Sequence, residues 1–222
     1  MTSTIDADLE DLVRRWERGW STCRGWIRPR EAGDALHLLQ DRPGRHREIV
    51  ALRPDLPAGL RALADEAASA REATWLTVPT TRPDAVEDVL GHAGLHVKPA
   101  REWLMTRSLV DHPRRALPGD YRATVSAAEF LTVRVRHDPD EPAASGQAAV
   151  TAGDAVFDRI ETARPHRRRG LGSVVMGTLA EEAVARGARH GLLVASAGGR
   201  ALYTRLGWRT RAAVVIATNQ PG

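Results

Sequence analysis

The chain has 222 residues, a formal net charge of +4 and an apolar fraction of 42%, enough for a hydrophobic core in one large domain or two small ones. Basic and acidic residues are interspersed, and no basic run is longer than residues 167–169, which argues against a nucleic-acid-binding surface. The N-terminus is acidic and no apolar stretch is long enough to span a membrane, so we expect a cytoplasmic protein without a membrane partner.

The first half of the chain predicts helices and strands in alternation. The single cysteine, Cys23, follows the helical pattern of the first segment and is expected to be buried and unreactive. One cysteine also excludes an internal disulfide and, without partner ligands, a cysteine-based zinc site. The expected elements are a helix at 8–20, strands at 35–39 and 47–52, a helix at 60–70, a strand at 74–78, a helix at 84–90 and a strand at 102–109.

A linker is expected at 111–120, where two prolines and a glycine interrupt the periodic pattern. Three successive strands then indicate an antiparallel meander, and helices and strands alternate to the end of the chain. The expected elements are strands at 130–136, 143–150 and 155–162, a helix at 172–186, a strand at 191–195, a helix at 201–206 and a strand at 212–217, with turns at 138–142 and 152–154.

The two halves of the chain are related in sequence. At an offset of 116 positions, residues 60–78 match residues 176–194, first along a helix and then along a strand, and Leu90 and Gly91 fall opposite Leu206 and Gly207. We therefore predict a duplicated half-domain, with residues 1–110 as the first copy and residues 111–222 as the second.

Residues 167–172, Arg-Arg-Arg-Gly-Leu-Gly, connect a predicted strand to a predicted helix. Gly170 and Gly172 allow a tight turn that brings backbone N–H groups toward a ligand, and the following helix adds the positive end of its dipole. Arg167, Arg168 and Arg169 would neutralise the same anion. The segment predicts a phosphate-binding loop; by itself, a glycine pair is equally compatible with a basic turn before a helix.

This loop and the Leu-Tyr-x-x-x-Gly-Trp segment at 202–208 together resemble the GNAT superfamily of N-acetyltransferases. The family signature R/Q-x-x-G-x-G/A is met by Arg167, Gly170 and Gly172. The resemblance covers about residues 130–217. It implies a mixed, twisted α/β sheet with flanking helices, acetyl-CoA as the co-substrate, and transfer of the acetyl group to a primary amine of a small molecule.

The resemblance also assigns expected roles to individual residues. In the family, the loop, here including Leu171 and Ser173, binds the pyrophosphate of acetyl-CoA. The preceding strand pairs its backbone with the pantetheine arm between two splayed strands, and the matching residues here are Ile160, Glu161 and Thr162. Tyr203 matches the residue that protonates the departing thiolate in many members, a step that a protonated phenol can perform.

The sequence departs from the family pattern at two positions. Arg164 stands where a proline is usual, with Pro165 displaced by one residue, and the asparagine common near the second helix is replaced around Gly198. Ser196 is expected to supply part of the missing polar contact; alternatively, it only forms the turn.

Attack on a thioester needs a neutral amine, so a base is expected nearby. Asp158 shares a predicted strand face with residues 154, 156 and 160, and its spacing to Arg167 is similar to that of a strand aspartate acting as base in some aminoglycoside-acetylating members. Glu161 faces the other way and is the second candidate, and a water relay is the third. Otherwise these carboxylates are surface groups paired with neighbouring arginines.

The first half lacks this machinery. Residues 51–56, opposite the loop, contain no glycine, and Glu87 falls opposite Tyr203. We expect a degenerate GNAT-like copy that acts as a scaffold, whose tryptophans either form a wall of the acceptor groove or belong to the core. These tryptophans are Trp16, Trp20, Trp75 and Trp103.

The sequence thus predicts an N-acetyltransferase that uses direct transfer. No metal is expected, because no cluster of His, Cys and carboxylate residues has the spacing of metal ligands. The alternatives are a non-catalytic acyl-CoA-binding sensor or assembly subunit, acetylation of a protein amine, and a nucleic-acid surface whose affinity falls with salt. The sequence leaves open the acceptor, the acyl chain length and the oligomeric state, including a homodimer.

One prediction concerns stoichiometry. Because only the second half carries the loop and Tyr203, each chain should bind a single acetyl-CoA, which calorimetric titration measures directly. Two coenzyme sites per chain would contradict the view that the first half is degenerate.

Overall fold

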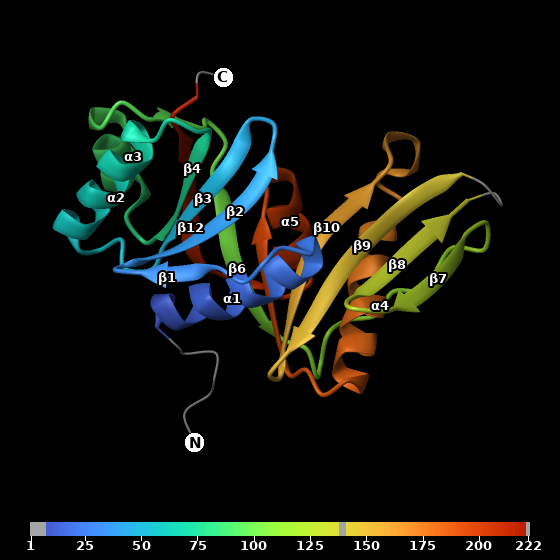
Figure 1. Ribbon diagram of the computed structural model, residues 1–222. Helices are drawn as coiled ribbons and strands as arrows, with labels where there is room; N and C mark the ends of the chain where they lie inside the picture. Colours follow the sequence, from blue (N-terminus) through green and yellow to red (C-terminus); the bar gives the residue numbers. More distant parts are fainter. Residues whose placement is uncertain (1–7, 138–140, 221–222) are drawn as a thin grey trace.

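The computed structural model describes residues 8–137 and 141–220. Within them, the strands form one mixed sheet, and Figure 1 shows α1 lying across one face while the other helices lie behind the opposite face. We call these the α1 face and the α4 face. The helices are α1 (Leu9–Arg24), α2 (Pro57–Ser69), α3 (Pro83–His92), α4 (Leu171–Ala185) and α5 (Ala197–Arg205), with a short 3-10 helix at Arg164–His166.

The strands confirm the expected α/β architecture. They are β1 (Arg30–Ala32), β2 (Ala35–Arg42), β3 (Arg45–Ala51), β4 (Thr74–Thr80), β5 (His96–Val97), β6 (Glu102–Ser108), β7 (Arg122–Ala127), β8 (Leu131–Arg136), β9 (Pro142–Thr151), β10 (Asp154–Thr162), β11 (His190–Ala195) and β12 (Arg209–Thr218). The antiparallel meander of β8, β9 and β10 is confirmed. Residues 138–140 of the turn predicted between the first two of these strands lie outside the described residues.

Three strands were not expected from the sequence, and each is short or lies at an edge. The three-residue β1 and the six-residue β7 form the two ends of the sheet, and β5 has two residues. All six residues of β7 are exposed. An edge strand exposed on both faces needs no apolar alternation, so it leaves no periodic signal in the sequence.

The last strands of the two halves are exchanged. The sheet runs β1-β2-β3-β4-β12-β6-β11-β10-β9-β8-β7, so β6 lies beside β11 of the second half and β12 lies beside β4 of the first. β6 and β12 also pair with each other, antiparallel, at the centre of the sheet. Each half therefore completes its part of the sheet with a strand from the other.

The offset of 116 residues predicted from the sequence aligns the buried positions of α2 with those of α4. It does not align the buried positions of β4 with those of β11. Leu63 of α2 and Leu179 of α4 are both buried against the α4 face. Leu76 also packs on that face, whereas Leu192, its predicted counterpart, packs beneath α1 on the other face. Leu193, the next residue, packs on the same face as Leu76, so the offset of 116 puts the strand side chains on opposite faces.

Two ion pairs fasten α1 along β10. Arg15 binds Asp154 through Nε and Nη2 at 2.8 and 2.7 Å, and Arg24 binds Asp158 at 2.5 and 2.9 Å. Nine residues of helix rise about 13.5 Å and four residues of strand about 13 Å, so the two spacings match. Nine residues also make about two and a half turns, so the arginines leave α1 on opposite sides and hold it from both flanks.

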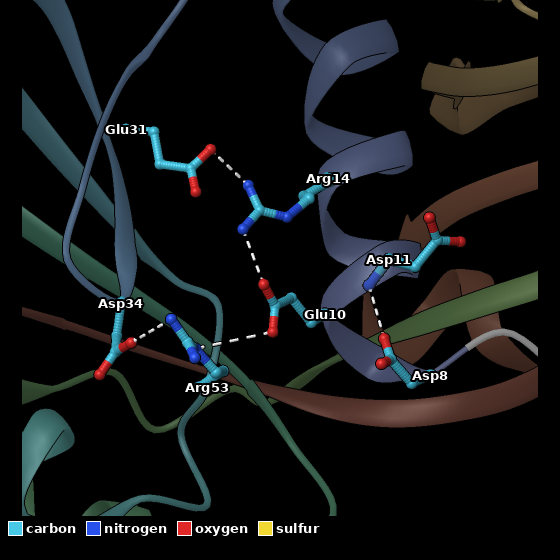
Figure 2. Close-up of polar contacts among 7 residues, drawn as sticks. All are labelled: Asp8, Glu10, Asp11, Arg14, Glu31, Asp34 and Arg53. Carbon is cyan, nitrogen blue, oxygen red and sulfur yellow. Dashed lines mark hydrogen bonds and ion pairs between the residues drawn. The ribbon is translucent and has the colours of Figure 1, made fainter.

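The first turn of α1 is tied to the first half of the chain (Figure 2). Asp8 caps the helix by accepting a hydrogen bond from the backbone N–H of Asp11 at 2.8 Å. Arg14 bridges Glu10 of the helix and Glu31 of β1, and Arg53 lies between Glu10 and Asp34. With its pairs to β10, α1 thus joins both halves of the molecule.

The expected linker packs closely against α4. A Cβ on Gly177 of α4 would lie 3.2 Å from the carbonyl oxygen of Pro113 and 3.4 Å from Cα of Arg114, so the glycine permits this approach. The imidazole of His112 is buried and accepts a hydrogen bond from Trp208, and burial lowers its pKa to about 4. Cys23 is buried as expected, and burial raises the pKa of its thiol to about 12.

None of the described helices is long and apolar enough to cross a membrane.

The strand exchange predicts that residues 111–222 do not fold as a separate fragment, because β11 would lose its neighbour β6 and β12 would lose both β4 and β6. We expect the fragment to lack a cooperative thermal transition by circular dichroism, and the whole chain to unfold in a single transition. Co-expression with residues 1–110 should restore a folded complex. A fragment that is stable by itself would contradict this view.

Candidate functional site

A V-shaped opening separates β10 and β11. The two strands are parallel and paired from Asp154 opposite His190 to Phe157 opposite Leu193, after which the pairing stops. The rest of β10 pairs with β9 alone, so the backbone edge of residues 158–162 that faces β11 is open. An extended ligand can add to such an edge through main-chain hydrogen bonds.

The predicted phosphate-binding loop lies at the wide end of this opening, where α4 begins. Gly170 is the N-cap residue with φ 84°, and it supplies no side chain to bind the first N–H groups of the helix. The first turn of α4 carries no acidic residue. Unoccupied N–H groups and the positive helix end together favour an anion at this point.

A hydrogen-bond network centred on buried His166 supports the loop. His166 is buried, with Nδ1 3.1 Å from the hydroxyl of Tyr121 and Nε2 3.0 Å from the carboxylate of Glu141. Arg169 donates a hydrogen bond to the same tyrosine hydroxyl at 3.0 Å. The network connects the loop to β7 and β9 and fixes the position from which α4 starts.

The opening continues into a groove of about 1060 Å³ that is rich in arginine. Most predicted site residues line it: Ile160, Glu161, Thr162, Arg167, Arg168, Gly170, Leu171, Gly172, Ser173, Ser196 and Tyr203. Asp158 and Arg169 are not among the lining residues, since one is bound to Arg24 and the other to Tyr121. Ser196 caps α5 by accepting a hydrogen bond from the N–H of Gly199 at 3.3 Å, so its turn-forming role is present.

Several arginines of the groove were missed by the sequence analysis. Arg134 and Arg136 alternate with buried residues of β8, a period-2 pattern that does mark them as a pair on one face. Arg115 comes from the linker, where no pattern identifies it. Its guanidinium lies over Gly170, at the point where a Cβ on that glycine would be. The absence of a side chain at Gly170 therefore brings a further cation to the anion-binding helix end.

Tyr203 projects from α5 into the same groove. Its side chain is 7% exposed and lies within the core cluster beneath α4. Burial, followed by the negative charge of Asp158, raises the pKa of its phenol to about 12. The hydroxyl therefore keeps its proton at neutral pH and is able to donate it to an anion formed in the groove.

A bulge in β10 changes which side chains share a face. Asp158 pairs with Gln147 and Glu161 pairs with Ser145, so β10 has one residue more than β9 between these two pairs. Arg159, which lies in this bulge, has φ 51°. Ile160 consequently packs toward α4. The expectation that Ile160 shares a face with Asp158 and that Glu161 points away was wrong: Asp158 and Glu161 lie on the same face.

Asp158 is paired with Arg24 of α1, and not with the neighbouring arginines considered from the sequence. Both carboxylate oxygens accept hydrogen bonds from the guanidinium. Glu161 is exposed in the groove. Within residues 8–137 and 141–220, no group of three or more His, Cys, Asp and Glu side chains is arranged to hold a metal ion.

Comparison with known proteins places these features in a family. Residues 54–208 match the model of the acetyltransferase (GNAT) family, a span that begins in the first half and ends after α5. No curated protein sequence matches the chain significantly.

Solved structures share the fold at low sequence identity. A GCN5-related N-acetyltransferase from Kribbella flavida is 20% identical over 98% of this chain and 97% of its own, with a TM-score of 0.70. One from Sphaerobacter thermophilus is 16% identical over 98% of this chain and 87% of its own, with a TM-score of 0.61. A tandem GNAT protein from the clavulanic acid biosynthesis pathway is 15% identical over 87% and 82%, with a TM-score of 0.58. With its split sheet, its glycine loop at the start of α4 and a family match over most of its length, the chain belongs to the GNAT family of acetyltransferases.

Proposed function

We propose that this protein transfers the acetyl group of acetyl-CoA directly to a primary amine of a small molecule. The observation that carries the proposal is the uncapped N-terminus of α4, which opens into an arginine-lined groove beside the split between β10 and β11. The groove offers backbone N–H groups and cations for phosphates at one end and an open strand edge for an extended arm.

The arrangement divides the chemistry among few groups. Arg115, Arg167 and Arg168 surround the start of α4 and would bind the phosphates of the coenzyme. A backbone N–H of the open β10 edge would polarise the thioester carbonyl. The buried phenol of Tyr203 would give its proton to the sulfur as the carbon–sulfur bond breaks.

The proposed division into a supporting half, 1–110, and a coenzyme-binding half, 111–222, fits the same geometry. Apart from Arg115 of the linker, every residue placed above on the coenzyme side follows residue 120. The first half nevertheless supplies α1 and β6, which border the split strands. In this proposal the active site depends on both halves.

Thiol release from acetyl-CoA in the presence of a panel of amines tests the proposed function. Saturable release that depends on the amine supports it. Tight binding of coenzyme with no release for any amine would instead favour a non-catalytic acyl-CoA-binding protein.

Tyr203→Phe should lower kcat on the order of 10²-fold, because the hydroxyl is needed only as the thiolate forms. The Kd for acetyl-CoA should stay near that of the wild type. Steady-state kinetics together with equilibrium binding measure both quantities. Equal turnover in the two proteins would leave Tyr203 with a packing role.

Arg115→Gln should weaken acetyl-CoA binding roughly tenfold at low salt, since it removes one charge-assisted contact to phosphate, and the difference should shrink as salt is added. Arg114→Gln is the matched control: its guanidinium pairs with Glu181 of α4 at 2.9 Å, and Arg114 is not among the groove-lining residues. Equal affinities of the two variants, measured by calorimetry, would remove Arg115 from the coenzyme site.

A further inference from the structure

Glu102, the first residue of β6, is a carboxylate without a partner in a half-buried position. It forms no hydrogen bond and no ion pair with any residue in 8–137 or 141–220, unlike Asp154 and Asp158 on strand β10. Burial raises its pKa, because desolvation disfavours the ionised form. A desolvated, unpaired carboxylate lowers stability, and such groups are common where a ligand supplies the missing cation.

The register of β6 places Glu102 beside the open end of the split strands. Leu104 belongs to the core beneath α1, and alternation along the strand puts Glu102 on the same α1 face. Trp103 pairs with Ala195, the last residue of β11. The next residue along the chain is Ser196, which lines the groove. Glu102 is therefore adjacent in the sheet to the end of the groove where β11 stops.

Two ion pairs act electrostatically on Glu102, and in each of them the two charges neutralise one another. After burial, the charges of Arg45 and Arg24 lower its pKa, and those of Glu48 and Asp158 raise it. Arg45 binds Glu48 at 2.6 Å, and Arg24 binds both oxygens of Asp158. Neither Arg45 nor Arg24 therefore forms an ion pair with Glu102.

Apolar side chains complete the surroundings on this face. Trp20, Trp26, Val194 and Ile216 are partly buried against the core cluster that contains Leu104. The rings of Trp20 and Trp26 meet edge to face at 4.6 Å. An unpaired carboxylate on a sheet face that also carries partly buried indoles suits a ligand with one ammonium group and an apolar or aromatic body.

We propose that Glu102 binds the ammonium group of the acceptor and takes a proton from it, so that the acceptor is a primary amine on an apolar or aromatic body. The inference rests on the proposed function and specifies its acceptor side. The carboxylate accepts one ammonium proton; the neutral nitrogen then forms the bond to the acetyl carbon. The carbon–sulfur bond breaks with its electron pair on sulfur, which receives a proton from Tyr203, and the new amide loses its remaining extra proton to solvent.

The test compares Glu102→Gln with the wild type, using phenethylamine as the acceptor. We expect the KM for phenethylamine to rise roughly tenfold or more, because a charge-assisted contact is lost, while the Kd for acetyl-CoA is unchanged. The acidic limb of the rate profile should disappear in Glu102→Gln and persist in Asp158→Asn. Glu102→Asp should restore part of the activity. Glu129→Gln, at an exposed residue of the turn between β7 and β8, is the control with the same chemical change.

An unchanged KM and an unchanged pH profile in Glu102→Gln would overturn this inference while leaving the proposed function in place. Loss of the acidic limb in Asp158→Asn, with the limb retained in Glu102→Gln, would assign the base to Asp158. A wild-type protein that binds coenzyme and acetylates no amine would overturn the proposed function and this inference with it.

Thermal unfolding distinguishes a ligand-binding role from a structural one. Because the folded-state pKa of Glu102 is raised, its ionisation favours the unfolded chain once the pH passes the unfolded-state value. Glu102→Gln should therefore melt at a higher temperature than the wild type at about pH 8, and the difference should vanish near pH 4. A lower melting temperature at about pH 8 would show that the carboxylate is structural.

Discussion

The exchange of β6 and β12 between the two halves is the constraint on which the rest of the structure depends. A strand at the edge of a sheet leaves a row of backbone groups unpaired, and here each half covers that row with the last strand of the other. The result is one continuous sheet with β12 and β6 at its centre. The first half thereby supplies β6, the strand beside β11, although that half has no glycine loop of its own.

The position of α1 follows from the same arrangement. Because α1 crosses the central strands, it needs favourable contacts with both halves of the molecule. Its polar side chains provide these contacts. The pairs Arg15–Asp154 and Arg24–Asp158 hold it to β10, and the contacts of Arg14 and Glu10 hold it to the first half. Both pairs are partly buried, so removal of one partner would leave the other charge incompletely solvated. This interaction gives Asp158 a structural function independent of any role in proton transfer.

Some features of the groove lower the stability of the folded chain and favour the binding of a ligand. Arg168 has φ 66°, a conformation unfavourable for a residue with a side chain, and the first N–H groups of α4 have no capping side chain. Arginines gather around the same point, where their charges repel one another. The hydrogen bonds of buried His166 to Tyr121 and to exposed Glu141 compensate by fixing the loop. Such a combination is expected where a polyanionic ligand supplies the missing partners.

The sequence by itself determined most elements, the glycine loop and Tyr203, because each depends on local spacing: apolar periods along helices and strands, and a strand, turn and helix in succession. Most of the site residues expected from the sequence line the groove. The tertiary structure alone decided the partner of Asp158, which lies 134 positions away in the chain, and the approach of Arg115 to Gly170. It also decided the face of Glu161, because a single bulged residue reverses the alternation that a sequence pattern assumes. Local spacing specifies which elements form, whereas long-range strand exchange and one irregular backbone position decide which side chains meet.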